Sequence, residues 1–184
     1  MIDKDGCLIF IHIARTGGTS VESAIAGSDW WQIDPETKHL SASQAYRQYG
    51  QDTWERCSRF TLIRNPYDRV VSMWFTKWWN FKAAELSFLE FVKQLKPHPH
   101  EKYNTLKYHE IIDRDDVDII KFEGLVGNLN SYLSKSGLDK VTLPHVEKRS
   151  RDIKDYRGYY CEASYQLVTE IYKKDLSIFD YKFD

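Results

Sequence analysis

The chain has 184 residues, of which 42% are apolar and 29% charged, with a formal net charge of −1 at pH 7. These values are ordinary for a soluble globular protein, so we expect a single domain over residues 1–184 with its own hydrophobic core. A nearly neutral chain has no overall basic field to recruit nucleic acid or an anionic membrane. Any anion site must therefore be local, and neither of those partners is expected. No pattern in the sequence fixes the oligomeric state.

The three cysteines, Cys7, Cys57 and Cys161, are odd in number and widely spaced. Because they form neither a Cys-x-x-Cys pair nor a His/Cys ligand spacing, they indicate no disulfide framework and no zinc site. The chain begins at Met1 without a leader pattern. No stretch approaches the roughly 18 consecutive apolar residues of a membrane span. We therefore expect a reduced, cytoplasmic protein without membrane insertion.

The first predicted unit is a strand followed by a helix. Residues 7–13, CLIFIHI, form an apolar run rich in branched side chains, which favours a strand covered on both faces of a parallel sheet. Thr19 with Glu22 three residues later has the pattern of a capping box, which predicts a helix over residues 20–25. Gly27 is expected to end that helix.

The same design repeats further along the chain. Residues 59–64 predict a second strand, after which Asn65 suits a helix N-cap and Pro66 the first helical position. Four apolar residues at helical spacing should face the core: Val70, Val71, Trp74 and Trp78. Residues 87–95 predict another helix.

The remaining elements complete an alternating pattern. A third strand is predicted over residues 117–123, a helix over residues 125–137 and a long amphipathic helix over residues 162–175. Strands that alternate with helices indicate an α/β domain, a three-layer sandwich with a mainly parallel central sheet and helices on both faces. In such sheets ligands bind beyond the carboxyl ends of the strands, where Arg15 and Arg64 both fall.

The loop after the first strand, ARTGGTS, has the composition of an anion site at a helix N-terminus. Gly17 and Gly18 let backbone N–H groups approach an oxyanion, and Arg15 adds a permanent charge. Further hydroxyl donors are Thr16, Thr19 and Ser20. The Gly-Lys-Ser/Thr ending of the common nucleotide loop is missing. The alternative interpretation is a tight turn with a helix cap and a solvated arginine.

The second strand-to-helix junction offers another anion site. Arg64 lies at the strand end and Ser72 on the following helix, so this pair can clamp a phosphate, unless Ser72 is only a small surface residue. Arg69 is expected to pair with an acidic neighbour and to stabilise the junction without touching ligand. Two anion sites at adjacent strand ends suit a nucleoside with phosphates at both ends, such as adenosine 3′,5′-bisphosphate (PAP) or its sulfonated form.

Together, HIARTGGTS and RFTLIRNPYDRVVSMW resemble the paired phosphate-binding motifs of sulfotransferases that use 3′-phosphoadenosine 5′-phosphosulfate (PAPS). The resemblance is closest to the carbohydrate branch typified by heparan sulfate 2-O-sulfotransferase. Weaker similarity in KHLSASQ, IIKFEGLVGNL and residues 143–181 extends it over most of the chain. It implies a P-loop-type fold, PAPS as donor substrate and no metal. The acceptor that it implies is a hydroxyl group, in the first place one of a carbohydrate.

The resemblance also implies residue roles. Residues 15–20 would bind the 5′-phosphosulfate, and Arg64 with Ser72 would bind the 3′-phosphate. Two residues depart from the family's usual first motif, His-Ile-Pro-Lys-Thr-Gly-Gly-Thr-Ser, because Ala14 replaces proline and Arg15 replaces lysine. Arginine keeps the charge but cannot lose its proton, so Arg15 is assigned electrostatic stabilisation of the leaving oxygen.

A base must take the proton of the acceptor hydroxyl, and histidine is the natural candidate near neutral pH. Among six histidines, His39 falls where the resembling family places its base, so His39 is the predicted catalytic base. His12 lies inside the first strand and is interpreted as structural. His98 and His100 flank Pro99 in a loop that can meet substrate.

Two further features are expected near the site. In the resembling family a late basic loop closes over the nucleotide, so Lys148 and Arg149 are candidate contacts, with a solvated charge run as the alternative. The aromatic cluster at residues 74–81 is expected mainly in the core, and an exposed member such as Trp79 can stack on a sugar ring.

The sequence leaves two other functions open. A small P-loop kinase would need Mg²⁺ and a strand-end carboxylate, for which Glu123 is the candidate, but the missing Lys-Ser/Thr argues against it. A non-catalytic PAP- or PAPS-binding module is kept open by Arg15 in place of lysine. The leading prediction is an active sulfotransferase, because the charge at the leaving oxygen is retained.

Overall fold

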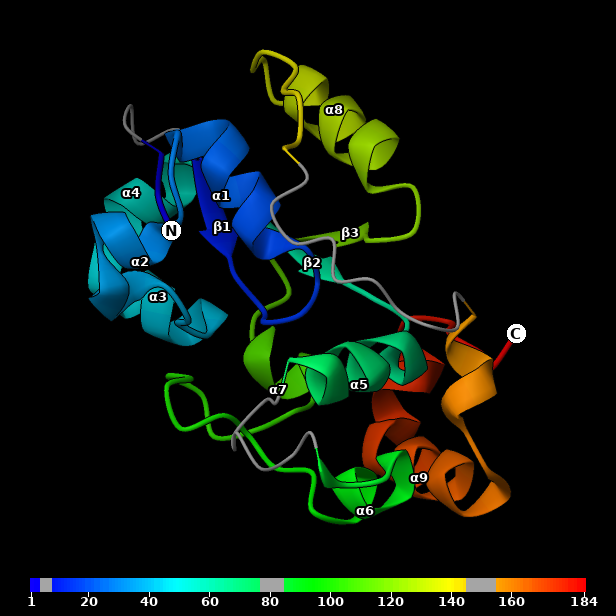
Figure 1. Ribbon diagram of the computed structural model, residues 1–184. Coiled ribbons are helices and arrows are strands. Elements are labelled where there is room, and N and C mark those ends of the chain that lie inside the picture. Colours follow the sequence, from blue (N-terminus) through cyan, green and yellow to red (C-terminus); the bar gives the residue numbers. More distant parts are fainter. Residues whose placement is uncertain (4–7, 77–84, 145–154) are drawn as a thin grey trace.

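The computed structural model describes residues 1–3, 8–76, 85–144 and 155–184 (Figure 1). In chain order its helices and strands are β1 (Leu8–Ile11), α1 (Gly18–Ala26), α2 (Trp30–Ile33), η1 (Pro35–Thr37), α3 (Ala42–Tyr49), α4 (Gln51–Arg56), β2 (Ser58–Ile63), α5 (Pro66–Phe75), α6 (Phe88–Lys93), α7 (Tyr108–Ile111), β3 (Asp118–Lys121), α8 (Leu125–Lys135), η3 (Tyr156–Tyr159) and α9 (Glu162–Ile178). No helix within these ranges is both long and apolar enough to cross a membrane.

The three strands form one parallel sheet in the order β1-β2-β3. The register places Ile9 opposite Arg59, and Thr61 opposite Ile119. The predicted strands and their parallel pairing are confirmed, although the first and third strands are shorter than the apolar runs that predicted them. Because β1 and β2 are neighbours with the same direction, the loops that follow them meet at one edge of the sheet.

Helices cover both faces of the sheet, as the sequence pattern predicted. On one face Phe10 and Phe60 pack in a cluster with residues of α1, α2 and α8, among them Val21, Trp30 and Leu129. On the other face, Ile9, Ile11 and Ile63 pack with residues of α3, α4 and α7. Successive strand residues point to opposite faces, which explains why β1 is apolar at every position.

A third apolar cluster lies beyond the carboxyl ends of the strands, where α5 packs against α6, η3 and α9 (Figure 1). Val70, Val71 and Met73 of α5 are buried in it, and Trp74 packs against it half-buried. Trp78 lies outside the described residues. The helices of this cluster form the support from which α5 presents its first two turns to the β1–α1 loop.

The predicted start of the first helix needs one correction. The N-cap of α1 is Gly17, without a side-chain capping bond, so Thr19 and Glu22 do not form a capping box. Glu22 is instead fully buried, with its carboxylate 2.5 Å from His12 Nδ1. Tertiary contacts have therefore taken the acidic residue away from the helix end. The predicted stop at Gly27 is confirmed by its C-cap φ of 78°.

Candidate active site

The site is built on the loop between β1 and α1, at the carboxyl end of the first strand. Two residues of this loop have left-handed backbone conformations, Arg15 with φ 66° and Gly17 with φ 93°. Glycine adopts such an angle freely, whereas arginine rarely does, and strained residues of this kind gather at functional sites. The bend turns the loop back so that α1 begins directly after it, with its N-terminal N–H groups facing the loop.

Packing requires the paired glycines, besides the approach of an anion for which the sequence predicts them. A Cβ atom on Gly18 would lie 2.8 Å from Cε1 of the His12 ring and closer still to two other ring atoms. A Cβ on Gly17 would lie 3.0 Å from the ring of Phe122, which follows β3. Both contacts are tighter than ordinary van der Waals contact, so the loop is pressed between two aromatic rings.

The hydroxyl groups of the loop differ in their exposure to solvent. Thr16 is fully buried, and its hydroxyl donates to Ile13 O at 2.7 Å, which corrects the prediction that its side chain contacts ligand. Thr19 and Ser20 are half-buried on the first turn of α1, and Thr19 lines the pocket described below. Thr16 can therefore contribute only its backbone N–H to an anion.

The second predicted anion site lies directly beside the first. Ser72 Oγ accepts hydrogen bonds from Nε and a terminal nitrogen of Arg15, at 3.2 and 3.1 Å. Arg64 pairs with Asp68 one helical turn later, at 2.5 Å, and its guanidinium stacks on Phe122 at 4.4 Å from the ring centroid. The structure therefore brings Arg15, Arg64 and Ser72 together, as the parallel order of β1 and β2 predicts.

Arg69 stabilises the junction from the protein interior. It is completely buried and donates to Ala14 O at 3.0 Å and to Leu106 O at 2.7 Å. The prediction that it stabilises the junction away from ligand agrees with this geometry, but no acidic side chain among the described residues forms an ion pair with it, and Glu101 acts on it only through its electrostatic field. Its partners are backbone carbonyls, and its guanidinium stacks on Tyr108 at 4.8 Å from the ring centroid.

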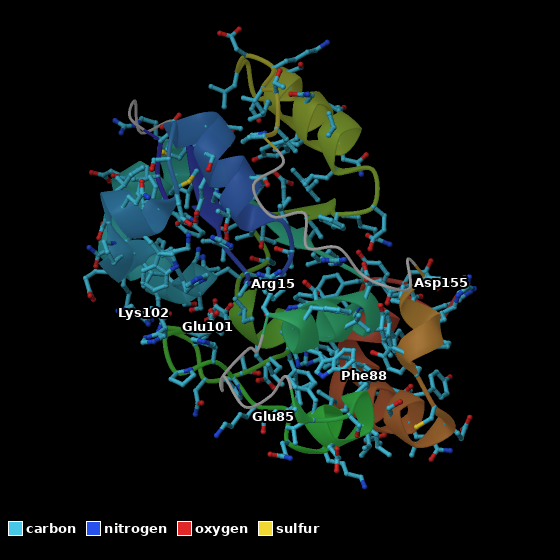
Figure 2. The ribbon with its side chains drawn as sticks, in the orientation of Figure 1. Arg15, Glu85, Phe88, Glu101, Lys102 and Asp155 are labelled. Atoms are coloured by element: carbon cyan, nitrogen blue, oxygen red, sulfur yellow. The ribbon has the colours of Figure 1, made fainter. Side chains whose placement is uncertain are left out.

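A cavity of about 390 Å³ opens between the β1–α1 loop and the segment that precedes α7. Figure 2 shows Arg15 and Glu101 on the two neighbouring segments that border it. Its lining residues are His12, Ala14, Arg15, Thr19, Asp29, Trp31, Lys38, His39, Thr76, His98, His100 and Glu101. Among the described residues of this lining only Ala14 and Trp31 are apolar, which favours a hydrophilic ligand.

His39 lies in this cavity together with Arg15, which the sequence predicted to act with it. Its ring is buried, and Nδ1 lies 3.0 Å from His12 O. Because a carbonyl oxygen only accepts, Nδ1 carries the proton and Nε2 keeps its lone pair. Burial, with the positive fields of His12 and Lys38, lowers the pKa of His39 to about 2, so the ring is neutral near pH 7.

A buried ionic chain lies behind His39, and sequence reasoning missed it. Lys38 is almost completely buried and pairs with Glu22 at 2.6 Å and with Asp29. Burial raises the pKa of Glu22, but the interactions with His12 and Lys38 outweigh it and bring that pKa down to about 2. The predicted structural role of His12 agrees with this geometry, because its ring is fixed by Glu22 and packs 4.7 Å from that of His39.

Trp31 and Glu101 are the other residues that no sequence pattern indicated. Trp31 is 42% exposed at the rim of the cavity, with the His39 ring edge-on at 5.6 Å. Glu101 has a 4% exposed side chain, and its Oε2 lies 3.4 Å from His39 Nδ1. Neither residue belongs to a periodic or glycine-rich motif, so only the folded chain places them beside His39.

The donor set fits a nucleotide that carries an anion at each end. The N-terminus of α1 lacks a side-chain cap, and Arg15 and Arg64 place two permanent charges at adjacent strand ends. A family model described as "Sulfotransferase family" matches residues 1–115. The chain belongs to the sulfotransferase family. No curated protein sequence matches it significantly.

Membership identifies a sulfotransferase that uses PAPS as its sulfuryl donor. The matched segment contains both predicted anion-binding junctions and His39, and it ends before β3. Lys148, Arg149 and Trp79 lie outside the described residues, so their predicted contacts stay predictions. Glu123, the carboxylate that a kinase would need, accepts hydrogen bonds from Asn65 N and from Tyr181, each at 2.8 Å. Its carboxylate is thus used to join β3 to neighbouring segments.

Proposed function

We propose that this sulfotransferase moves the sulfuryl group of PAPS to a hydroxyl of a carbohydrate, by in-line transfer without a metal. The observation that carries this proposal is the cavity that Arg15, Thr19 and His39 line together. The loop that would hold the phosphosulfate and the neutral imidazole of His39 line the same cavity. A shared cavity of this kind supports a transfer in which the acceptor hydroxyl lies between a base and the donor loop.

The lining of the cavity supports a sugar as the acceptor. Ten of the twelve described lining residues are polar or charged, which favours a polar acceptor over a flat apolar one such as a phenol. Trp31 adds a single exposed aromatic ring at the rim, which suits the apolar face of a sugar. These features, with the motif resemblance, favour the carbohydrate branch that includes heparan sulfate 2-O-sulfotransferase.

Arg15 stabilises the charge that develops on the leaving oxygen. Its guanidinium is fixed by Ser72, which prevents a costly reorganisation during the reaction. The positive end of α1 and the N–H groups of residues 17–19 act on the same anion. Arg64 would take the 3′-phosphate, with its orientation fixed by Asp68 and Phe122.

His39 accepts the proton of the acceptor hydroxyl at Nε2. The hydrogen bond from Nδ1 to His12 O selects the tautomer in which Nε2 is basic. The neutral ring is already present at physiological pH because its pKa is lowered by burial. The acceptor oxygen becomes more nucleophilic as this proton leaves. Because the lowered pKa makes His39 a weak base by itself, its assistance depends on a second group that takes the proton onward.

Titration calorimetry with PAP and AMP tests the assignment of the two anion sites. Native protein should prefer PAP, and Arg64→Ala should lose that preference while its AMP affinity changes little. Arg114→Ala is a matched control, because Arg114 also pairs with an aspartate, Asp116, and stacks on an aromatic ring, that of Tyr46. Equal affinity of native protein for PAP and AMP contradicts the proposal.

A further inference from the structure

We propose that Glu101 is a positioning and proton-accepting partner of His39, so that the proton of the acceptor hydroxyl passes through the imidazole to this carboxylate. The inference rests on the proposed role of His39 as the base. It adds a residue that lies outside both phosphate motifs, in the segment between α6 and α7.

The position of the Glu101 carboxylate is the first observation. Its side chain is 4% exposed, it lines the same cavity as Arg15 and His39, and its Oε2 lies 3.4 Å from His39 Nδ1. Oε2 has no hydrogen-bond partner among the residues that the structure describes. A buried carboxylate oxygen without a partner is unfavourable, so its retention beside the base calls for a function.

The protonation of the pair is the second observation. His39 is a weak base, because burial and its charged neighbours bring its pKa to about 2. Glu101 binds a proton more strongly. Burial raises its pKa to about 7, against the lowering effects of Tyr103, Arg69 and Lys38. The groups that face the pair therefore leave Glu101 as the stronger base of the two.

The transfer balances without any further reactant. The acceptor O–H bond breaks as an N–H bond forms at His39 Nε2, and the imidazolium then loses its Nδ1 proton to Glu101 Oε2. His39 ends neutral with the proton on Nε2, and Glu101 ends as a neutral carboxylic acid. Nδ1 of His39 is then without a proton. The cycle is complete once Glu101 has released its proton to solvent and the ring has returned to the tautomer that is protonated at Nδ1.

Turnover of PAPS with water as the acceptor gives the first test, measured as release of PAP across about pH 5 to 9. Native protein should show a rate that rises through an apparent pKa near 7, and Glu101→Gln should abolish that rise and lower the rate at pH 8 about 10²-fold. Glu101→Asp should restore the rise in part. The matched control Glu36→Gln removes an exposed carboxylate that pairs with Lys102, and should leave the profile unchanged.

Nitrogen NMR of the His39 ring tests the same pair without turnover. The ring shifts of native protein should change with a midpoint near pH 7 as Glu101 ionises, and that change should be absent in Glu101→Gln, with Nδ1 still protonated. If the midpoint persists in Glu101→Gln, or if native protein shows none, the inference is overturned. A purely structural role would lower the melting temperature of Glu101→Gln and leave the pH profile of its residual turnover intact, which also overturns it.

The outcomes separate this inference from the proposed function. Failure of native protein to prefer PAP over AMP would contradict the anion sites and leave the NMR result to decide on Glu101. Native turnover with a rising pH profile, shared unchanged by Glu101→Gln, would contradict Glu101 alone.

Discussion

The substitution Gly18→Ala tests how tightly the anion-binding loop is packed. The added Cβ would lie 2.8 Å from His12 Cε1 and closer to Cδ2 and Nε2 of the same ring. Ordinary contact distances between carbon atoms are about 3.5–4.0 Å, so the ring or the helix start must move. The ring cannot move freely, because Glu22 holds it at 2.5 Å and Phe10 stacks on it at 5.5 Å.

The expected cost follows from this overlap. Overpacking of a well-filled core costs about 1–3 kcal/mol. In a chain of this length each kcal/mol corresponds to a melting-temperature shift of about 2–4 °C, so the variant should melt about 2–12 °C lower. Because His12 O accepts from His39, displacement of His12 should also weaken PAP binding and disturb the proposed base.

Thermal unfolding and PAP calorimetry measure both effects. Gly127→Ala is the matched control, since Gly127 is an exposed residue within α8, and no described atom outside its own stretch of helix backbone lies within 4 Å of the position that a Cβ would take. Alanine there should stabilise the helix by about 0.5–1 kcal/mol. If Gly18→Ala melts at or above the native temperature with native PAP affinity, the packing argument for this loop is refuted.

Three further predictions concern the supports of the site. Arg69→Met should cost about 2–5 kcal/mol in urea unfolding, because Ala14 O and Leu106 O each lose a buried donor; a cost below about 1 kcal/mol would refute that role. Trp31→Ala should raise the KM for a carbohydrate acceptor about 2- to 10-fold and leave PAP affinity unchanged, whereas an unchanged KM would argue against stacking. Since the folded pKa of His39 is near 2, the unfolded ring takes up protons first as pH falls below 6.5, and stability declines. His39→Gln should therefore lose less stability than native protein between about pH 7 and 5, and an equal loss would count against the lowered pKa.

Local sequence patterns predicted the elements that carry the anion-binding junctions. The apolar runs located β1 and β2, and Asn65 and Pro66 located the start of α5, where Asn65 accepts a hydrogen bond from Tyr67 N. These signals are reliable because they depend on neighbours in sequence: burial on both faces of a strand, and the unsatisfied N–H groups of a helix end. Arg15 and Arg64 were predicted to lie close together because each follows a strand of the same parallel sheet.

Long-range contacts decided what the sequence missed. Glu22 has the spacing of a capping residue, but its contact with His12 and the charge of Lys38 hold it in the core. Arg69 donates to carbonyls 37 and 55 residues away in the chain, and no local pattern encodes such partners. Glu101 likewise reaches His39 only because the segment before α7 folds back onto the β1–α1 loop.

Transfer of radiolabelled sulfate from PAPS to a panel of glycans tests the central claim most directly. Native protein should label a carbohydrate and release one PAP for each sulfate transferred, His39→Gln should slow the transfer about 10²-fold or more, and Arg15→Lys should retain it. A native protein that binds PAP but labels no glycan in the panel, while it labels a phenolic or peptide hydroxyl or nothing at all, would contradict the account.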